Sequence, residues 1–421
     1  MKRILDFIAL NLSYFIAKRL ATSKKYKSSV SAPIIKIAIA AVAISVVMML
    51  VSVATGLGLQ QKIRDKITSF NGHVVISNFD NNQSEITLEP ISTDQHFYPE
   101  FTDVPEVTAV HPFATKAGVV RTEKSFEGIV FKGVDENYQW NYLQDYLIEG
   151  NLPKYEAEGM TNEVLISSYL ANRLELKVGE KLPTYFLRNQ EAKVPNVRSF
   201  TIVGIYDSGF PQFDEIFVLG DLKHVQRLNR WEADKVGGFE VFVNDFSKID
   251  QIADKIYSHI PSTLNSEPIT TKYFNIFDWL QLFDFNIYII VGMVFLVAMI
   301  NVIVALLVLI LERTQMIGVL KALGTSNWTI RKIFVYNATY IVLVGLIIGN
   351  VVGIGLLLLQ QYFGIITLDP AQYYVKEAPV YLSVGYILLI NALMIVMSYL
   401  IMLIPSYLTT QITPVKSLKF Q

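Results

Sequence analysis

The residue types that most often catalyse reactions or bind metals occur in this 421-residue chain without the spacing that either task requires. The five histidines are scattered, and we interpret each as a structural or surface residue: His73, His96, His111, His224 and His259. Cysteine is absent, which excludes disulfides, a thiol nucleophile and a thiolate metal site. The sequence contains no G-x-x-x-x-G-K-S/T phosphate loop, no G-x-S-x-G elbow and no H-E-x-x-H pair. We therefore expect no catalytic residue and no metal site.

Four stretches lack Asp, Glu, Lys and Arg altogether: residues 37–61, 285–311, 333–368 and 378–415. Each is longer than the ~20 apolar residues that cross a bilayer core as a helix. A soluble globular protein is therefore excluded, and we expect an α-helical membrane protein with four transmembrane helices. Their predicted limits are 33–60, 285–311, 333–361 and 380–405.

Glycines in the third predicted span allow a close approach to another helix. Gly345, Gly349 and Gly353 recur every four residues, so they share one helix face. The partner helix lies either in the same chain or across a dimer seam.

The distribution of charge predicts the orientation of the spans. Residues 1–36 hold eight Lys and Arg against one acid, whereas residues 62–284 hold 21 basic and 33 acidic residues. Because Lys and Arg near span ends favour the cytoplasmic side, both termini and the connection 312–332 are predicted to be cytoplasmic. The short loop 362–379 and the segment 61–284 then lie outside, and residues 406–421 form a cytoplasmic tail.

Residues 1–32 do not resemble a cleavable signal peptide, because their basic cluster follows the apolar residues. Their apolar residues recur at helical spacing, which predicts an amphipathic helix on the inner leaflet or against a partner.

The outer segment 61–284 mixes strand and helix patterns, which predicts a large α+β domain between the first two spans, formed as one body or as two lobes. The predicted strands are 73–79, 117–121, 128–134, 199–206, 216–219 and 239–244. The predicted helices are 163–174, 221–229 and 250–260. Residues 80–99 are polar and lack apolar periodicity, which indicates a mobile insertion.

The connection between the second and third spans predicts a short helix. Helix formers run from Met316 to Leu323 and stop at Gly324, after which Thr325 or Ser326 can cap a new helix. Such a helix either seats in a groove of a partner or serves as an interfacial connector.

Several of these segments resemble one family of membrane proteins. The Glu-Arg…Ile-Gly-Val-Leu-Lys-Ala-Leu-Gly-Thr-Ser pattern of residues 312–326 resembles the coupling region of FtsX/MacB-type ABC permeases. The ending Pro405…Pro414-Val-Lys-Ser-Leu is similar to the ends of these chains. With Phe15-Ile-Ala-Lys-Arg-Leu, Gly56-Leu-Gly-Leu and Phe70-Asn-Gly-His-Val-Val-Ile, the combination most resembles the LolC/LolE lipoprotein-releasing permeases.

The resemblance implies a permease subunit of an ATP-driven inner-membrane complex that extracts lipoproteins from the outer leaflet. The implied partners are a LolD-like ATPase dimer, a second permease (a copy or a LolC/LolE-like relative), the lipoprotein, a LolA-like periplasmic carrier and membrane lipid, with no nucleic acid. This chain would bind no cofactor, because ATP and Mg²⁺ belong to the ATPase. The alternatives are a MacB-like efflux component and an FtsX-like activator of a cell-wall hydrolase.

The resemblance also places three candidate sites. A carrier-docking hook corresponds to Pro183, Tyr185, Phe186, Leu187, Arg188, Gln190, Pro195 and Arg198. A lipoprotein cavity at the outer ends of the first two spans corresponds to Met48, Met49, Val53, Leu57, Phe283, Phe285, Tyr288 and Ile289. Coupling to the ATPase corresponds to Arg313, Met316, Ile317, Leu320, Lys321, Leu323 and Gly324.

Overall fold

The computed structural model describes residues 15–16, 31–81, 84–156, 158–186 and 195–411. They form two compact units. The helical unit contains the described residues up to 60, 281–367 and 377–411, and the α/β unit contains those of 61–280 and 368–376. Most of the predicted N-terminal helix, the tip of the predicted hook and the last ten residues lie outside the described residues.

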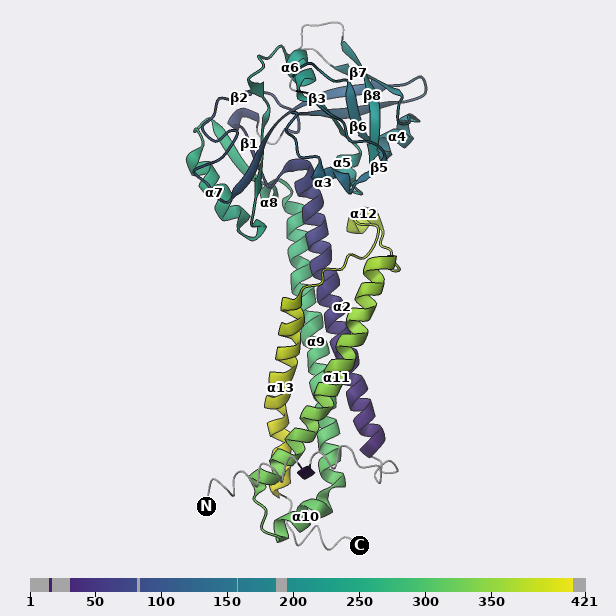
Figure 1. The fold of residues 1–421 in the computed structure, drawn as a ribbon, viewed down its shortest axis with the longest axis vertical. Helices are drawn as coiled ribbons and strands as arrows, with labels where there is room; N and C mark the ends of the chain where they lie inside the picture. The colour runs from purple at the N-terminus through teal and green to yellow at the C-terminus, as the bar shows by residue number, and fades with distance from the viewer. Residues whose placement is uncertain (1–14, 17–30, 82–83, 157, 187–194, 412–421) are drawn as a thin grey trace. The chain divides into compact units, whose positions relative to one another are not determined.

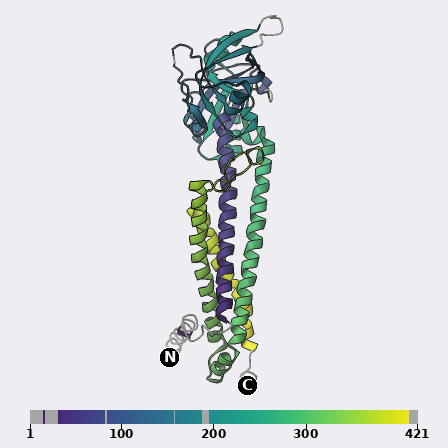
Figure 2. The ribbon, with the colours of Figure 1, turned by 90° about the vertical axis from the view of Figure 1, so that its right-hand side faces the viewer.

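Four long helices of the structure confirm the predicted membrane spans (Figures 1 and 2). They are α2 (Ser31–Asn71), α9 (Phe274–Glu312), α11 (Asn327–Phe363) and α13 (Val384–Gln411). Helix α2 continues eleven residues beyond the predicted limit of 60, and α9 begins eleven residues before 285. The sequence-based limits mark where charged residues begin, but charged side chains do not interrupt the backbone hydrogen bonds of a helix.

The glycines of α11 pack within this chain. A Cβ atom at Gly345 would lie 2.7 Å from Cβ of Val42, and one at Gly349 would lie 2.7 Å from Cβ of Val46. Atoms do not approach so closely, so only glycine allows α11 to contact α2 at these positions.

Polar side chains join α11 to its neighbours inside the helical unit. Asn350 and Asn391 of α13 exchange two hydrogen bonds, in which each Nδ2 donates to the other Oδ1 at 2.7 and 3.0 Å. Near the end of α11, Gln360 donates to the carbonyls of Ile366 and Ala378 and accepts from the Ile366 N–H. These bonds satisfy polar groups where a bilayer core provides no water.

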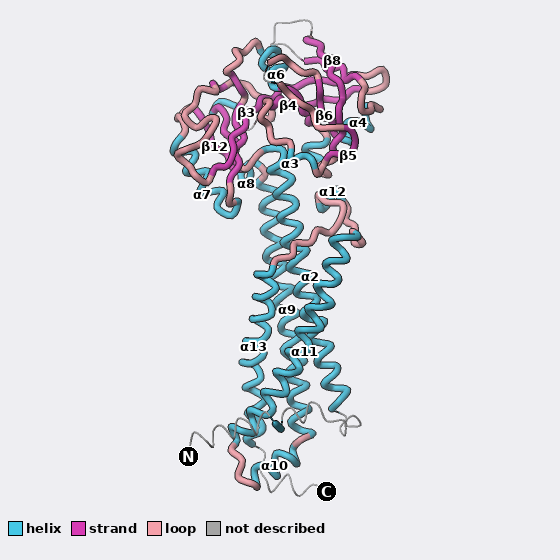
Figure 3. The backbone as a smooth tube through the Cα atoms, in the orientation of Figure 1, coloured by secondary structure: helices cyan, strands magenta, loops and turns pink. Residues whose placement is uncertain are grey.

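The α/β unit contains the strands of the structure (Figure 3). They are β1 (Val74–Asn78), β2 (Ile91–Ser92), β3 (Val107–Arg121), β4 (Phe126–Val134), β5 (Leu147–Gly150), β6 (Glu163–Ser167), β7 (Lys181–Phe186), β8 (Asn196–Tyr206), β9 (Phe217–Asp221), β10 (Lys235–Val236), β11 (Gly238–Val243) and β12 (Leu264–Pro268).

Six of these strands close into a barrel. Strands β3, β4, β9, β6, β8 and β7 pair in that order, and β7 pairs back with β3. The rings of Phe131, Phe186 and Phe200 meet inside, with centroids 4.9–6.3 Å apart. An open extension, β12-β1-β11, continues from the first half of β3. The 15-residue β3 therefore belongs to both parts and holds them in one sheet.

Short helices flank the sheet and complete the unit. They are η2 (Phe79–Asn81), α3 (Asn141–Gln144), α4 (Ser168–Leu174), α5 (Pro211–Asp214), α6 (Leu222–Asn229), η3 (Phe246–Lys248), α7 (Ile249–His259), α8 (Ile269–Lys272) and α12 (Pro370–Tyr373). The predicted helix 163–174 is wrong in its first part, because Glu163–Ser167 forms the buried strand β6. A short apolar run without alternating polar residues is compatible with a central strand as well as with a helix. Here the run forms a strand because it pairs with β8 and β9.

The prediction of a mobile insertion at residues 80–99 is also wrong for its described residues. Phe97 is fully buried and its ring stacks on Phe101 with centroids 5.5 Å apart. The Asn81 side chain accepts hydrogen bonds from the N–H groups of Leu88 and Glu89. Side-chain bonds thus replace the apolar periodicity whose absence suggested mobility.

Candidate functional site

The first candidate site is the connection between α9 and α11, where α10 spans Thr314–Ala322. Gly324 follows with φ +84°, a conformation that favours glycine, and Ser326 caps α11 by accepting from the Thr329 N–H. The local sequence therefore forms a helix, a sharp turn and a second capped helix, as the residue types predict.

Burial divides the predicted coupling residues of α10 into two groups. Ile317 is fully buried in the core of the helical unit, and Met316 and Leu320 pack against that core. Ile317 is therefore not a contact residue for another protein in this structure, contrary to the prediction. Arg313 and Lys321 are half-buried, while Leu323 is 78% exposed.

The structure adds two residues to the exposed side of this connection. Val319 is 42% exposed and Trp328 is 54% exposed, and neither belonged to the predicted set. We call these two residues and Leu323, all three of them exposed and apolar, the α10 surface. The sequence did not show that Val319 rather than its neighbour Leu320 is the exposed residue, because both side chains are apolar.

The second candidate site is the outer part of α2 and α9. The two helices touch there, because a Cβ atom at Gly56 would lie 2.2 Å from Cδ1 of Ile287. One turn away, Gln60 Nε2 donates to Asp284 Oδ1 at 2.8 Å. Met49 is buried in the core of the helical unit, so it does not line a cavity as predicted.

The other predicted cavity residues lie at the surface of the helical unit or near it. Val53, Leu57 and Phe283 are half-buried. The exposed members are Met48 (49%), Phe285 (64%), Tyr288 (73%) and Ile289 (42%). The structure thus brings three of the four predicted residues of α9, Phe285, Tyr288 and Ile289, together on an exposed apolar face.

The third candidate site is the β7–β8 hairpin. Strands β7 and β8 pair from Lys181–Thr201 to Phe186–Asn196, and residues 187–195 connect them in the sequence. Leu187, Arg188 and Gln190 lie outside the described residues. Phe186 is fully buried inside the barrel, which corrects its predicted role as an exposed anchor. Tyr185 and Pro183 are half-buried, Arg198 is half-buried on β8, and Pro195 is exposed.

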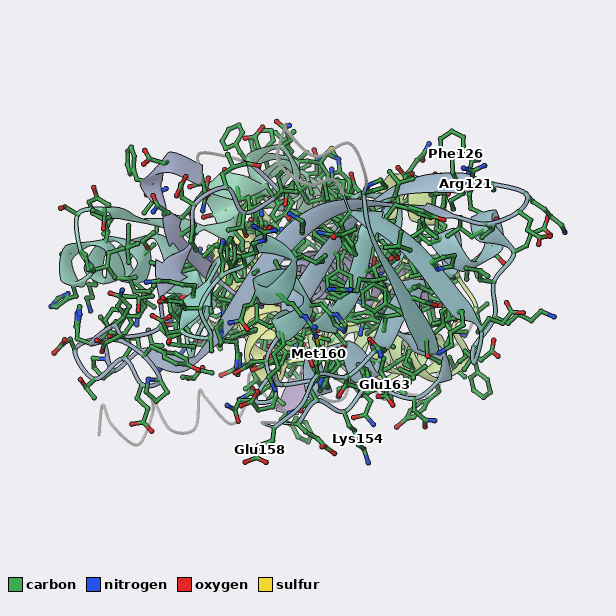
Figure 4. The ribbon with its side chains drawn as sticks, turned by 90° about the horizontal axis from the view of Figure 1, so that it is seen from above. Arg121, Phe126, Lys154, Glu158, Met160 and Glu163 are labelled. Atoms are coloured by element: carbon green, nitrogen blue, oxygen red, sulfur yellow. The ribbon has the colours of Figure 1, made fainter. Side chains whose placement is uncertain are left out.

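A cleft of about 670 Å³ lies beside this hairpin. Pro183 and Tyr185 line one side, and the β3–β4 connection lines the other with Arg121 and Phe126 (Figure 4). The Phe126 ring is 73% exposed. An exposed aromatic residue beside basic and proline residues is typical of protein interaction sites. Sequence reasoning missed this connection because Phe126 lies 55 residues before Lys181, the first residue of β7.

Buried ionisable groups of the α/β unit serve its structure. Burial lowers the pKa of His73 to about 4, and its neutral ring accepts a hydrogen bond from the Val243 N–H. Burial raises the pKa of Asp135 and of Asp214 to about 6. Within the described part of the chain, no group of three or more His, Cys, Asp or Glu residues is placed to hold a metal ion.

Comparison with known proteins identifies both parts of the chain. Residues 37–258, more than half of the chain, match the MacB-like periplasmic core domain, and residues 288–414 match the FtsX-like permease C-terminal region. The lipoprotein-releasing system transmembrane protein LolC of Xylella fastidiosa (strain Temecula1) is 20% identical over 98% of both chains. LolE of Haemophilus influenzae is 21% identical over 82% of both chains.

A solved structure of the periplasmic region of MacB from Actinobacillus actinomycetemcomitans is 14% identical. It covers 52% of this chain and 97% of that one, with a TM-score of 0.33. The two family matches and the four spans agree on a multi-pass membrane protein with a periplasmic domain. The chain belongs to the family of ABC transporter permeases that join a MacB-like periplasmic core domain to an FtsX-like C-terminal region, and it is of the LolC/LolE type.

Proposed function

We propose that this chain is the permease subunit of an ATP-driven complex that extracts lipoproteins from the outer leaflet of the inner membrane and passes them to a periplasmic carrier. The observation that carries the proposal is the match to LolC over 98% of both chains. The reaction requires work, since each buried CH₂ of an acyl chain contributes ~0.8 kcal/mol and a triacylated anchor rarely leaves the bilayer unaided.

The work is assigned to a partner, because this sequence has no phosphate loop. A LolD-like ATPase dimer binds ATP and Mg²⁺ on the cytoplasmic side, and this chain itself catalyses no reaction and binds no cofactor. The α10 surface supports this assignment, since exposed apolar residues on a short helix suit a groove in another protein. The basic N-terminal segment supports a cytoplasmic location for both termini.

The lipoprotein enters between two permeases, of which the second is a copy of this chain or a LolC/LolE-like relative. Support comes from the exposed face of α9, where Phe285 and Tyr288 offer apolar surface to acyl chains. Aromatic rings suit this task because they provide a large apolar area.

A LolA-like carrier receives the lipoprotein at the α/β unit. The cleft with Phe126 beside the β7–β8 hairpin supports this docking position. Both strands of the hairpin belong to the closed barrel, because β7 pairs with β3 as well as with β8.

Reconstitution tests the proposed function. Proteoliposomes that contain this chain, its cognate ATPase and a triacylated lipoprotein should release the lipoprotein to a soluble carrier only with ATP, not with a non-hydrolysable analogue. Absence of release, together with adaptor-dependent export of a small molecule, would favour the MacB-like alternative. Activation of a cell-wall hydrolase without lipoprotein release would favour the FtsX-like one.

A further inference from the structure

A cavity of about 180 Å³ lies in the α/β unit, apart from the three sites described above. This volume is more than tenfold the ~10–15 Å³ that a single water requires. Strands β1, β3, β4 and β11 provide its floor, and residues 84–87 of the folded insertion form one wall. The side chain of Glu85 in that wall is 41% exposed, so the cavity is accessible from solvent.

The cavity contains two lysines, and each already has an anionic partner. Lys132 and Glu240 form a buried ion pair at 2.5 Å, in which Lys132 also donates to the Phe70 carbonyl. Lys272 pairs with Glu85 at 3.2 Å. The positive charges of the cavity are therefore neutralised by its own residues.

Two carboxylates of the cavity can still accept hydrogen bonds. Glu240 is 2% exposed, and its Oε2 atom has no hydrogen-bond partner among the described residues. Glu267 lines the same cavity and is half-buried; no hydrogen bond or close ion pair holds its carboxylate among the described residues, although Lys272 lies near enough to attract it electrostatically. A buried carboxylate oxygen without a donor is costly, because it has lost water and gained no partner. The unmatched Glu240 oxygen therefore calls for a hydrogen-bond donor, and the carboxylate of Glu267 adds a negative charge that favours a cationic ligand.

The register of the sheet sets the distance between these two acceptors. Val75 of β1 lies opposite Glu240 on one side and opposite Glu267 on the other, so both glutamates occupy the same face. Strands β11 and β12 are thus two strand spacings apart, roughly 10 Å at the backbone. A single metal ion needs ligands within ~2–2.6 Å, and these carboxylates are not among any metal-binding group of the described residues. An extended organic cation matches the separation better.

We propose that this cavity binds a small organic cation with primary ammonium groups, held by Glu240 and Glu267. One ammonium donates to Glu240 Oε2, and the other pairs with the carboxylate of Glu267. The hydroxyls of Thr87 and Thr115, which lie 3.2 Å apart at the cavity, provide polar contacts for the body of the ligand. The site gives the 80–99 segment a role, since this segment supplies the wall that encloses it. The inference does not depend on the lipoprotein reaction.

Calorimetric titration of the full chain in an amine-free maltoside detergent tests the proposal. Putrescine serves as the probe, and 1,4-butanediol serves as its neutral control of the same chain length. Putrescine should bind with one site per chain, and the diol should not bind. Glu267→Gln should weaken putrescine binding at least tenfold, because it removes the charge without breaking an ion pair. Glu149→Gln, on the exposed strand β5, should leave the affinity within twofold of the original.

Three results would overturn the proposal: no binding of putrescine, equal binding of the diol, or unchanged binding by a folded Glu267→Gln variant. Thermal melting of each variant shows whether it is folded. Glu240→Gln provides a second measurement, and it should also weaken putrescine binding if its melting curve shows a folded protein.

Discussion

Asp214 illustrates how a single buried carboxyl group affects the α/β unit. The residue is 6% exposed, and its Oδ1 accepts hydrogen bonds from the Ser208 N–H at 3.2 Å and from the Ser208 hydroxyl at 2.7 Å. Burial nevertheless raises its pKa to about 6. The folded state therefore binds a proton more readily than the unfolded chain, in which the pKa is ~3.9. Stability from this group is present below about pH 4 and is lost as pH rises to about 6.

Asp214→Asn should therefore stabilise the protein at neutral pH. The amide resembles the protonated acid and its oxygen still accepts from Ser208, so we expect a melting temperature ~2–4 °C higher at pH 7.5, or ~1 kcal/mol. The gain should vanish near pH 4. Melting curves of the detergent-solubilised chain across this pH range check the prediction, with exposed Asp145→Asn as the control. An equal gain at both pH values would contradict the proposed cause.

At the scale of elements, the α10 surface gives a prediction for the proposed contact with an ATPase. Leu323 and Val319 are exposed and apolar, so Val319→Asp together with Leu323→Asp should abolish co-purification with the ATPase. Burial of each side chain in a groove contributes roughly 1.5–3 kcal/mol. Gln315→Asp, an exposed position on the same helix, should have little effect.

The variant must also reach the membrane in normal amounts for this comparison. If Val319→Asp/Leu323→Asp inserts normally and still co-purifies with a substrate-stimulated ATPase, the α10 surface is not the coupling element.

The asparagine pair between α11 and α13 gives a second prediction for the elements. Asn350→Leu removes one partner and leaves Asn391 Oδ1 without its donor, although Asn391 Nδ2 still donates to the Ile387 carbonyl, so the change should lower the melting temperature. The double change to leucine should recover part of the loss, because no unpaired group remains. A double-mutant cycle should give a coupling energy of about 0.6–1.7 kcal/mol. Additive losses would show that the two side chains do not act as a pair.

For the whole molecule, the proposed reaction predicts that carrier docking can be separated from complex assembly. Phe186 pairs directly with Asn196, so residues 187–195 can be replaced by Asn-Gly, a turn that preserves the register of the hairpin. We expect this variant to bind its ATPase normally and to lose carrier binding in a pull-down assay. Phe126→Ser, in the adjoining cleft, should weaken carrier binding several-fold. Full carrier binding by both variants would exclude this face as the docking site.

The sequence alone determined the number of spans and the class of the molecule. Runs without charge must lie in an apolar environment whatever their neighbours, and a bilayer sets their minimum length. The strands at 73–79, 128–134 and 239–244 were predictable for a similar reason, since their apolar residues define local periods. Helix α10 was predictable from its helix-forming residues, from Gly324 after its end and from the cap of the next helix at Ser326.

Tertiary structure decided which side of each element is available for binding. Phe186 and Ile317 looked like contact residues, yet Phe131 and Phe200 cover the first and the helical core covers the second. Residues 163–167 became a strand because β8 and β9 lie beside them. Burial depends on packing partners that are distant in the sequence. The apolar character of a residue therefore indicates that it packs against other apolar groups. Only the fold shows whether those groups belong to the same chain or to another protein.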